Sequence, residues 1–153
     1  MSMSELPGLL ALTFRAVIDQ LHENLAAEGF SDVRPAHAFT FQYLSHRPEG
    51  VTAVELGEHL GMTKQAAVQL IDELTQRGYV ERRPHPTDRR SRLIRLTQRG
   101  WFCIERMVFW SAEIERHWAG LIGADQLDQL QNGLREFVRD TATRRPVTLR
   151  PVW

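Results

Sequence analysis

Arginine is concentrated in one short stretch of the chain. The sequence HPTDRRSRLIRLTQRG, residues 85–100, contains five arginines and a single acid, Asp88. Guanidinium groups bind phosphates and base edges through paired hydrogen bonds, so such a cluster is typical of a nucleic-acid contact. The wider segment 77–99 has eight arginines and two acids, which gives +6 in a protein whose formal net charge is zero. A solvated charged hairpin is the alternative interpretation.

The rest of the composition indicates an ordinary globular chain. It has 153 residues, of which 42% are hydrophobic and 25% are charged, as expected for a soluble domain. No apolar run approaches the roughly 18 residues that cross a bilayer, and the N-terminus lacks the basic start of a secretory signal. The one cysteine, Cys103, excludes an intrachain disulfide and suits a reducing compartment. We therefore expect a cytoplasmic protein with no membrane partner.

Two short helices joined by a tight turn are predicted before the arginine-rich stretch. Thr52 and Glu55 form the S/T-x-x-E capping box, and Gly61 ends the first helix. Thr63 caps the second helix, which stops at Gly78. The second helix has a buried stripe at i, i+3, i+4 and i+7, formed by Ala67, Leu70, Ile71 and Leu74. This pattern is a helix-turn-helix arrangement.

The opposite face of the second helix carries side chains that suit DNA. Its N-terminal half presents Lys64, Gln65, Val68 and Gln69. Lysine, glutamine and a small apolar side chain reach phosphates, adenine edges and thymine methyl groups. An ordinary exposed helix face is the alternative.

After Gly78 the apolar period changes from 3.6 to 2. The segments 79–83 and 92–96 are predicted strands, and 84–88 is predicted as their turn. Ile94 and Leu96 then share a buried face. The remaining predicted helices cover residues 6–27, 35–45, 98–121 and 125–141.

This order of elements resembles the MarR family of bacterial transcriptional regulators over nearly the whole chain. The most specific part is RGYVERRPHPTDRRSRLIRLTQRG, residues 77–100, which resembles the family's wing. Gly78 precedes an aromatic residue and a valine, and an Asp-x-Arg motif lies at Asp88 and Arg90. Leu-Thr at positions 96–97 then opens the next helix. The segment DVRPAHA is also similar to the family's second helix.

The resemblance implies a fold that is mainly α with a small β-hairpin wing. This is a winged helix-turn-helix with N- and C-terminal dimerisation helices. The implied DNA-binding lobe covers residues 35–97, and the dimerisation helices cover 5–30 and 98–142. An extended tail covers 143–153. A homodimer of this kind is expected to bind double-stranded DNA at a pseudo-palindromic operator.

The resemblance also implies roles for single residues. The recognition helix begins at Thr63. Arg90 matches the arginine at the wing tip that enters the minor groove, and Asp88 matches the acid that orients it. Arg89 and Arg92 are placed for phosphates. A narrow minor groove has a strong negative potential, which attracts a guanidinium group.

The implied function is a transcriptional regulator, by default a repressor, that a small aromatic or phenolic ligand releases from DNA. Such a ligand would bind between the lobe and the dimerisation helices. The candidate lining residues are Arg15, His22, His37 and Trp110. Each of them is alternatively a surface or half-buried residue without a ligand.

Two other functions stay open at this point. One is a winged-helix module that no longer binds DNA and uses its hydrophobic helices for a protein partner, although the wing charge argues against it. The other is a redox-responsive regulator switched at Cys103, for which a packing cysteine is the favoured interpretation. The histidines do not cluster at ligand spacing, and no enzyme or cofactor-binding motif is found. We expect no catalysis, no metal and no cofactor.

Overall fold

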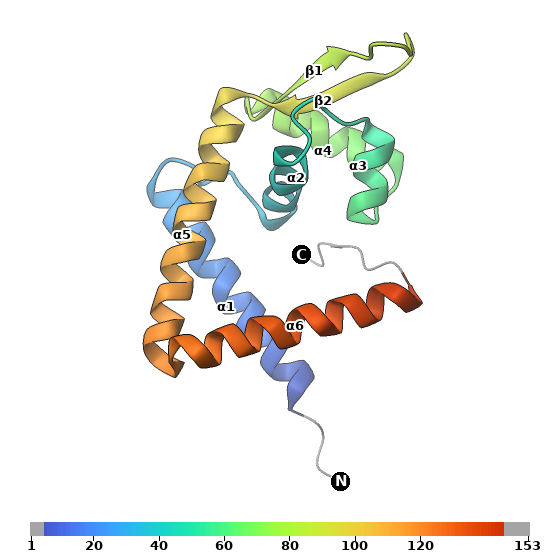
Figure 1. The fold of residues 1–153 in the computed structure, drawn as a ribbon. Coiled ribbons are helices and arrows are strands. Elements are labelled where there is room, and N and C mark those ends of the chain that lie inside the picture. Colours follow the sequence, from blue (N-terminus) through green and yellow to red (C-terminus); the bar gives the residue numbers. More distant parts are fainter. Residues whose placement is uncertain (1–4, 146–153) are drawn as a thin grey trace.

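The structure, a computed structural model, describes residues 5–145 of the chain. These residues form six helices and one β-hairpin. The elements are α1 (Leu6–Ala27), α2 (Pro35–Ser45), α3 (Ala53–Leu60), α4 (Lys64–Gln76), β1 (Val80–Pro84), β2 (Arg92–Leu96), α5 (Gln98–Ile122) and α6 (Ala124–Arg144). The hairpin and the helices α2, α3 and α4 form a lobe at one end of the molecule, and α1, α5 and α6 form the other end (Figure 1). The predicted fold class, mainly α with a β-hairpin wing, is confirmed.

The helix-turn-helix begins and ends at residues that cap helices. The hydroxyl of Thr52 accepts the N–H of Glu55 at 3.2 Å, and the carboxylate of Glu55 accepts the N–H of Thr52 at 2.8 Å. Gly61 closes α3 in the left-handed region, with φ +66°. The hydroxyl of Thr63 accepts the N–H of Ala66 at 3.1 Å and begins α4. These local hydrogen bonds determine where both helices start.

Close packing holds α3 against α4. A Cβ atom on Gly57 would lie 3.1 Å from the Met62 carbonyl and 3.5 Å from the Ala67 side chain. The inward stripe of α4 is buried, as its spacing predicts, and consists of Ala67, Leu70, Ile71 and Leu74. The face of α4 that carries the polar side chains is therefore left outward.

The hairpin pairs Val80 with Leu96 at its base and Pro84 with Arg92 toward its turn. Val51 adds a bridge to Ile94, with N–H···O distances of 2.9 and 2.7 Å. Ile94 and Leu96 are buried, as the alternation predicts. The first strand begins and ends one residue later than expected and includes Pro84, which is tolerated at the end of an edge strand.

The base of the hairpin is joined to the start of α5. The Thr97 hydroxyl donates to the Gly78 carbonyl at 2.5 Å and accepts the N–H of Gly100 at 3.2 Å. The N–H of Thr97 donates to the Tyr79 carbonyl at 3.0 Å. A Cβ atom on Gly100 would collide with that carbonyl and lie 2.8 Å from the Leu96 side chain. Leu96, Thr97 and Gly100 thus together connect the base of the hairpin to the start of α5.

The last helix is longer than predicted. Residues 143 and 144, which the sequence assigned to the extended tail, belong to α6. Arg145 is extended, with φ −159° and ψ 149°, because the residue before a proline disfavours the helical region. The rest of the predicted tail, residues 146–153, lies outside the described residues.

Apolar side chains are exposed at the end of the molecule away from the hairpin. Only Leu21 and Leu25 of α1 are buried, whereas Leu12 is 72% exposed and Leu121 of α5 is 70% exposed. The exposed set on the three helices includes Leu6, Leu9, Leu10, Leu12, Leu121, Ile122, Leu130, Leu134, Phe137 and Val138. No helix within residues 5–145 is both long and apolar enough for a membrane span. Exposed apolar surface of this extent marks an interaction surface.

Candidate nucleic-acid interface

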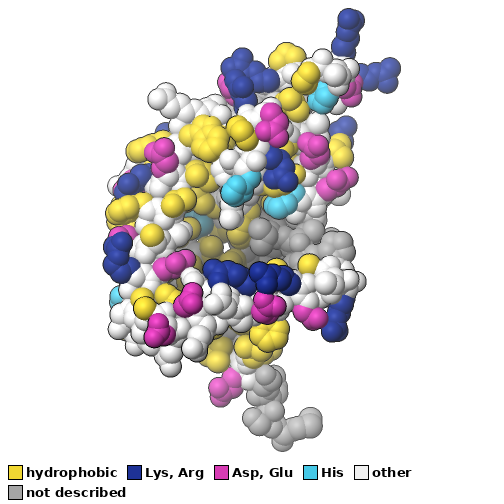
Figure 2. Space-filling view, in the orientation of Figure 1, with side chains coloured by type: hydrophobic (Ala, Val, Ile, Leu, Met, Phe, Trp, Pro, Cys, Tyr) yellow, Lys and Arg dark blue, Asp and Glu magenta, His cyan; other side chains and the backbone are white. Residues whose placement is uncertain are grey.

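The eight arginines of residues 77–99 fall into two groups. The members of the first group lie within 4.0 Å of a carboxylate and are Arg77, Arg82, Arg83, Arg95 and Arg99. The members of the second group have no acidic partner among the described residues and are Arg89, Arg90 and Arg92. Basic side chains project from the free end of the hairpin (Figure 2). The uncompensated positive charge is therefore concentrated at the turn of the wing and beside it.

The wing turn is held by side chains that bond its backbone. His85 Nδ1 accepts the N–H groups of Thr87 at 3.2 Å and Asp88 at 3.0 Å. Asp88 Oδ1 accepts the N–H of Arg90 at 2.9 Å, and Asp88 Oδ2 accepts the Ser91 hydroxyl at 3.0 Å. These two hydrogen bonds hold the pKa of Asp88 below its usual range. Asp88 thus positions the backbone of Arg90. The resemblance had implied instead that Asp88 orients the guanidinium group.

The predicted contact residues of α4 lie on its outward face. Lys64, Gln65 and Gln69 are exposed, and Val68 is half-buried. Thr63 is exposed as well, but its hydroxyl is engaged as the N-cap of the helix. The helix thus offers a long cation and two amides beside a small apolar surface, the mixture that the sequence predicted.

A shallow depression connects the outward face of α4 with the hairpin. Its volume is about 180 Å³, and its lining includes Lys64 and Val68 from the helix and Arg90 and Arg92 from the wing. Side chains predicted separately from two elements therefore share one surface. Arg82 on β1 also lines this depression and pairs with Asp72 on α4.

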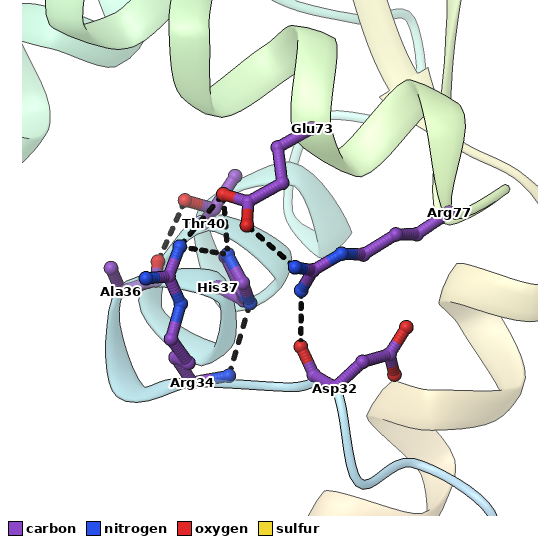
Figure 3. A network of polar contacts seen from close by, with 7 residues as sticks. All are labelled: Asp32, Arg34, Ala36, His37, Thr40, Glu73 and Arg77. Carbon is purple, nitrogen blue, oxygen red and sulfur yellow. Dashed lines mark hydrogen bonds and ion pairs between the residues drawn. The ribbon is translucent and has the colours of Figure 1, made fainter.

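Behind the outward face, a charged network fixes α4 to the segment that precedes α2 (Figure 3). The Glu73 carboxylate accepts hydrogen bonds from Arg34 Nη2 at 2.7 Å and from Arg77 Nη2 at 2.6 Å, and His37 Nε2 lies 3.3 Å from it. Arg77 also donates to the backbone carbonyl of Asp32 at 2.5 Å. One carboxylate on α4 thus joins Arg34 and His37 at the start of α2 to Arg77 at the end of α4.

His37 lies in this network and does not line a ligand pocket. Its side chain is fully buried, and its Nδ1 accepts the N–H of Arg34 at 3.0 Å. Nε2 then carries the proton of the neutral ring and donates to Glu73. Burial, together with the charges of Arg34 and Arg77, lowers the pKa of His37, although Glu73 acts in the opposite direction. The sequence expectation for His37 is therefore corrected: its ring caps the start of α2.

The lowered pKa of His37 predicts a loss of stability in acid. The unfolded chain takes up a proton near the ordinary value of about 6.5, whereas the folded protein resists it to lower pH. The stabilisation is therefore complete above that value and declines as the pH falls through it. In urea unfolding, we expect the free energy of unfolding to decrease between about pH 7.5 and about pH 5.5, and less steeply in His37→Gln. His46→Gln, at an exposed site, is the control, and equal slopes for wild type and His37→Gln would contradict this assignment.

A second polar cluster connects α5 with the loop between α1 and α2. The buried Tyr79 donates its hydroxyl proton to Asp32 Oδ1 at 2.6 Å, and Arg99 Nη2 donates to the Tyr79 hydroxyl at 3.0 Å. The Arg99 guanidinium also lies 4.5 Å from the centre of the Tyr79 ring. Burial and the Asp32 carboxylate raise the pKa of Tyr79. The sequence did not predict this cluster, although Tyr79 is the aromatic residue of the wing motif.

The other candidate ligand residues lie in two separate depressions. Arg15 and His22 line a depression of about 280 Å³ between α1 and the start of α2. Trp110 lines a different one, of about 450 Å³, between α1 and α5. Arg15 pairs with Asp19 at 3.0 Å, so part of its charge is already neutralised. The four predicted residues do not share a single pocket.

Cys103 is fully buried in the core at the start of α5. Burial raises the pKa of its thiol to about 12. Because the thiolate is the form that reacts with oxidants, this environment suppresses reactivity. The surroundings favour a packing role and argue against a thiol switch.

The capped helix pair, the hairpin that follows it and the depression between them define a winged helix-turn-helix protein. Residues 31–91 match the family described as MarR family. This match covers the winged-helix segment, and the chain as a whole has the same fold as solved MarR-family structures.

Solved structures of MarR-family proteins agree with the whole fold. Apo MarR from E. coli is 23% identical, with a TM-score of 0.71 over 90% of this chain and 99% of that chain. The transcriptional repressor CouR, bound to a 23-mer DNA duplex, is 26% identical, with a TM-score of 0.71 over 90% and 97%. A MarR variant from E. coli complexed with operator DNA is 24% identical, with a TM-score of 0.70 over 87% and 93%.

Proposed function

We propose that this protein is a transcriptional regulator that binds double-stranded DNA sequence-specifically as a homodimer. The observation that carries the proposal is the placement of the unpaired arginines Arg90 and Arg92 beside the outward face of α4, with Arg89 next to them in the wing turn. An arginine without an acidic partner keeps its full charge for phosphate. The family match and the two relatives solved with DNA support the same conclusion.

In this proposal α4 enters a major groove and the wing lies over the neighbouring minor groove. Lys64 binds phosphate, and Gln65, Val68 and Gln69 meet base edges and methyl groups. The N-terminus of α4, capped by Thr63, approaches the backbone.

The wing contributes by position and by charge. Asp88 fixes the backbone at Arg90, which places that guanidinium group for the minor groove. Arg89 and Arg92 bind phosphates on either side. The wing is thus the source of most of the non-specific, salt-dependent attraction.

The proposed dimer buries the apolar surface of α1, α5 and α6. A groove of about 530 Å³ between these helices is lined by Phe14, Val17, Ile114, Leu127 and Leu130, among others. A second copy of the chain supplies apolar side chains of the same kind, and two-fold pairing of such surfaces is the commonest form of homo-oligomer. Two recognition helices then face a pseudo-palindromic operator about one helical turn apart.

Repression released by a small aromatic or phenolic ligand completes the proposal. The depression beside Arg15 and His22 is the candidate pocket, because it offers a guanidinium and an imidazole next to the apolar Ile18 and Val33. The free and the DNA-bound dimer are proposed to differ in the spacing of their recognition helices. A ligand releases DNA only if it binds these two conformations with different affinity.

The proposal is tested by measuring binding to a duplex from the chain's own upstream region at two salt concentrations. A regulator that neutralises phosphates is expected to lose affinity steeply as salt rises. Absence of binding even at low salt would favour the alternative, a winged-helix module for a protein partner.

Arg90→Ala is expected to weaken binding to that duplex about tenfold, because one groove contact is lost while the wing backbone stays in place. Arg83→Ala is the matched control, since Arg83 lies on the same hairpin but pairs with Glu81 at 3.1 Å. Size-exclusion chromatography should give the same oligomeric state for both variants and wild type. Unchanged affinity in Arg90→Ala would remove Arg90 from the interface.

A further inference from the structure

We propose that Arg82 controls DNA affinity without contacting DNA, by neutralising the carboxylate of Asp72 on the outward face of α4. The inference rests on the proposed function and adds a residue to it. It concerns an ion pair between the wing and the recognition helix that no sequence pattern singled out.

Asp72 lies where a free negative charge would oppose DNA binding. Lys64, Val68 and Asp72 follow one another at four-residue intervals, so they lie along one strip of the helix. The Asp72 side chain is 55% exposed. The adjacent acid, Glu73, points inward to its own network. Asp72 is therefore the carboxylate that α4 presents toward a bound phosphate backbone.

Arg82 is placed to remove that charge. It lies on β1, and its guanidinium forms the ion pair with Asp72 Oδ1 through Nη2. Nη1 of the same group donates to the Thr75 hydroxyl at 3.3 Å, one turn further along α4. The Arg82 side chain is only 29% exposed. Two anchor points on α4 fix the guanidinium group over the carboxylate.

The position of Arg82 explains why neutralisation of Asp72 would affect DNA binding. Arg82 lines the same depression as Lys64, Arg90 and Arg92 and pairs with Asp72, so the ion pair joins the surface whose cations are proposed to meet DNA. An uncompensated carboxylate there repels phosphate and attracts those cations away from it. With Arg82 in place, the Asp72 carboxylate no longer opposes the positive side chains that are proposed to face DNA.

A purely structural ion pair and a charge-neutralising one predict different results. If Arg82 acted only by fastening the wing to α4, removal of Asp72 would weaken DNA binding as much as removal of Arg82. If Arg82 itself bound phosphate, its loss would weaken binding whether or not Asp72 were present. Only neutralisation predicts that removal of the carboxylate restores the affinity that Arg82→Ala loses.

The test compares wild type, Arg82→Ala, Asp72→Asn and the double variant on the upstream-region duplex at low salt. We expect Arg82→Ala to bind about fivefold more weakly, and Asp72→Asn and the double variant to bind within about twofold of wild type. Arg82→Lys keeps the charge and is expected to retain affinity, which provides a result even if Arg82→Ala unfolds. Circular dichroism verifies the fold of each variant.

The outcomes separate this inference from the function on which it rests. A double variant as weak as Arg82→Ala, or an Arg82→Lys variant that is folded but weak, overturns the role of Arg82 while DNA binding by wild type stands. Failure of wild type itself to bind the duplex at low salt overturns both.

Discussion

Gly100→Ala is expected to lower the free energy of unfolding by about 3 kcal/mol, because the added methyl group has no room. The new Cβ atom would collide with the Tyr79 carbonyl, which already accepts the N–H of Thr97 at 3.0 Å. It would also lie 2.8 Å from Leu96 Cδ2. The backbone at the base of the wing must therefore shift to make room. Urea unfolding of the variant and of wild type in parallel measures the loss of stability.

Gly120→Ala is the matched control, because it is the same substitution in the same helix. A Cβ atom on Gly120 meets no heavy atom within 4 Å. Alanine has the higher helix propensity, so this variant should be more stable than wild type by about 0.5 kcal/mol. Equal stability of Gly100→Ala and wild type would show that the backbone between the hairpin and α5 can accommodate a Cβ atom at this position.

Glu73→Ala is expected to lower the free energy of unfolding by about 2 kcal/mol. The substitution leaves Arg34 and Arg77 without their carboxylate and removes the acceptor for the buried His37. Glu73 is 30% exposed, so water compensates part of the loss, and we place the effect below that of a fully buried pair. Thermal and urea unfolding measure it.

Glu58→Ala on α3 serves as the control for Glu73→Ala. Glu58 is exposed, and a glutamate-to-alanine change at such a site is expected to alter stability by less than about 0.5 kcal/mol. A Glu73→Ala variant as stable as the Glu58→Ala variant would mean that the network in Figure 3 contributes no net stability.

The sequence predicts the helix-turn-helix well because its signals are local. Thr52, Glu55, Gly61 and Thr63 form hydrogen bonds or turns within four residues of themselves. Such contacts depend on the type and spacing of neighbouring residues, which a sequence displays directly. The outward face of α4 follows from the same periodicity.

The contacts that join the elements could not be predicted in this way. His37 lies 36 residues from Glu73, and Asp32 lies 47 residues from Tyr79. Nothing in the local pattern around His37 distinguishes a ring that caps a helix from one that lines a pocket. Asp88 illustrates the same point at shorter range, since only the turn geometry assigns its carboxylate to the backbone of Arg90.

The bonded turn of the wing also has a thermodynamic consequence. The ring of His85 and the carboxylate of Asp88 each hold N–H groups of the turn, so the loop is ordered before any partner arrives. A loop that must order on binding loses conformational entropy at that moment, which reduces affinity. This turn has lost that entropy during folding. The entropy that remains to be lost on binding is therefore expected to be mainly the rotamer entropy of the arginine side chains.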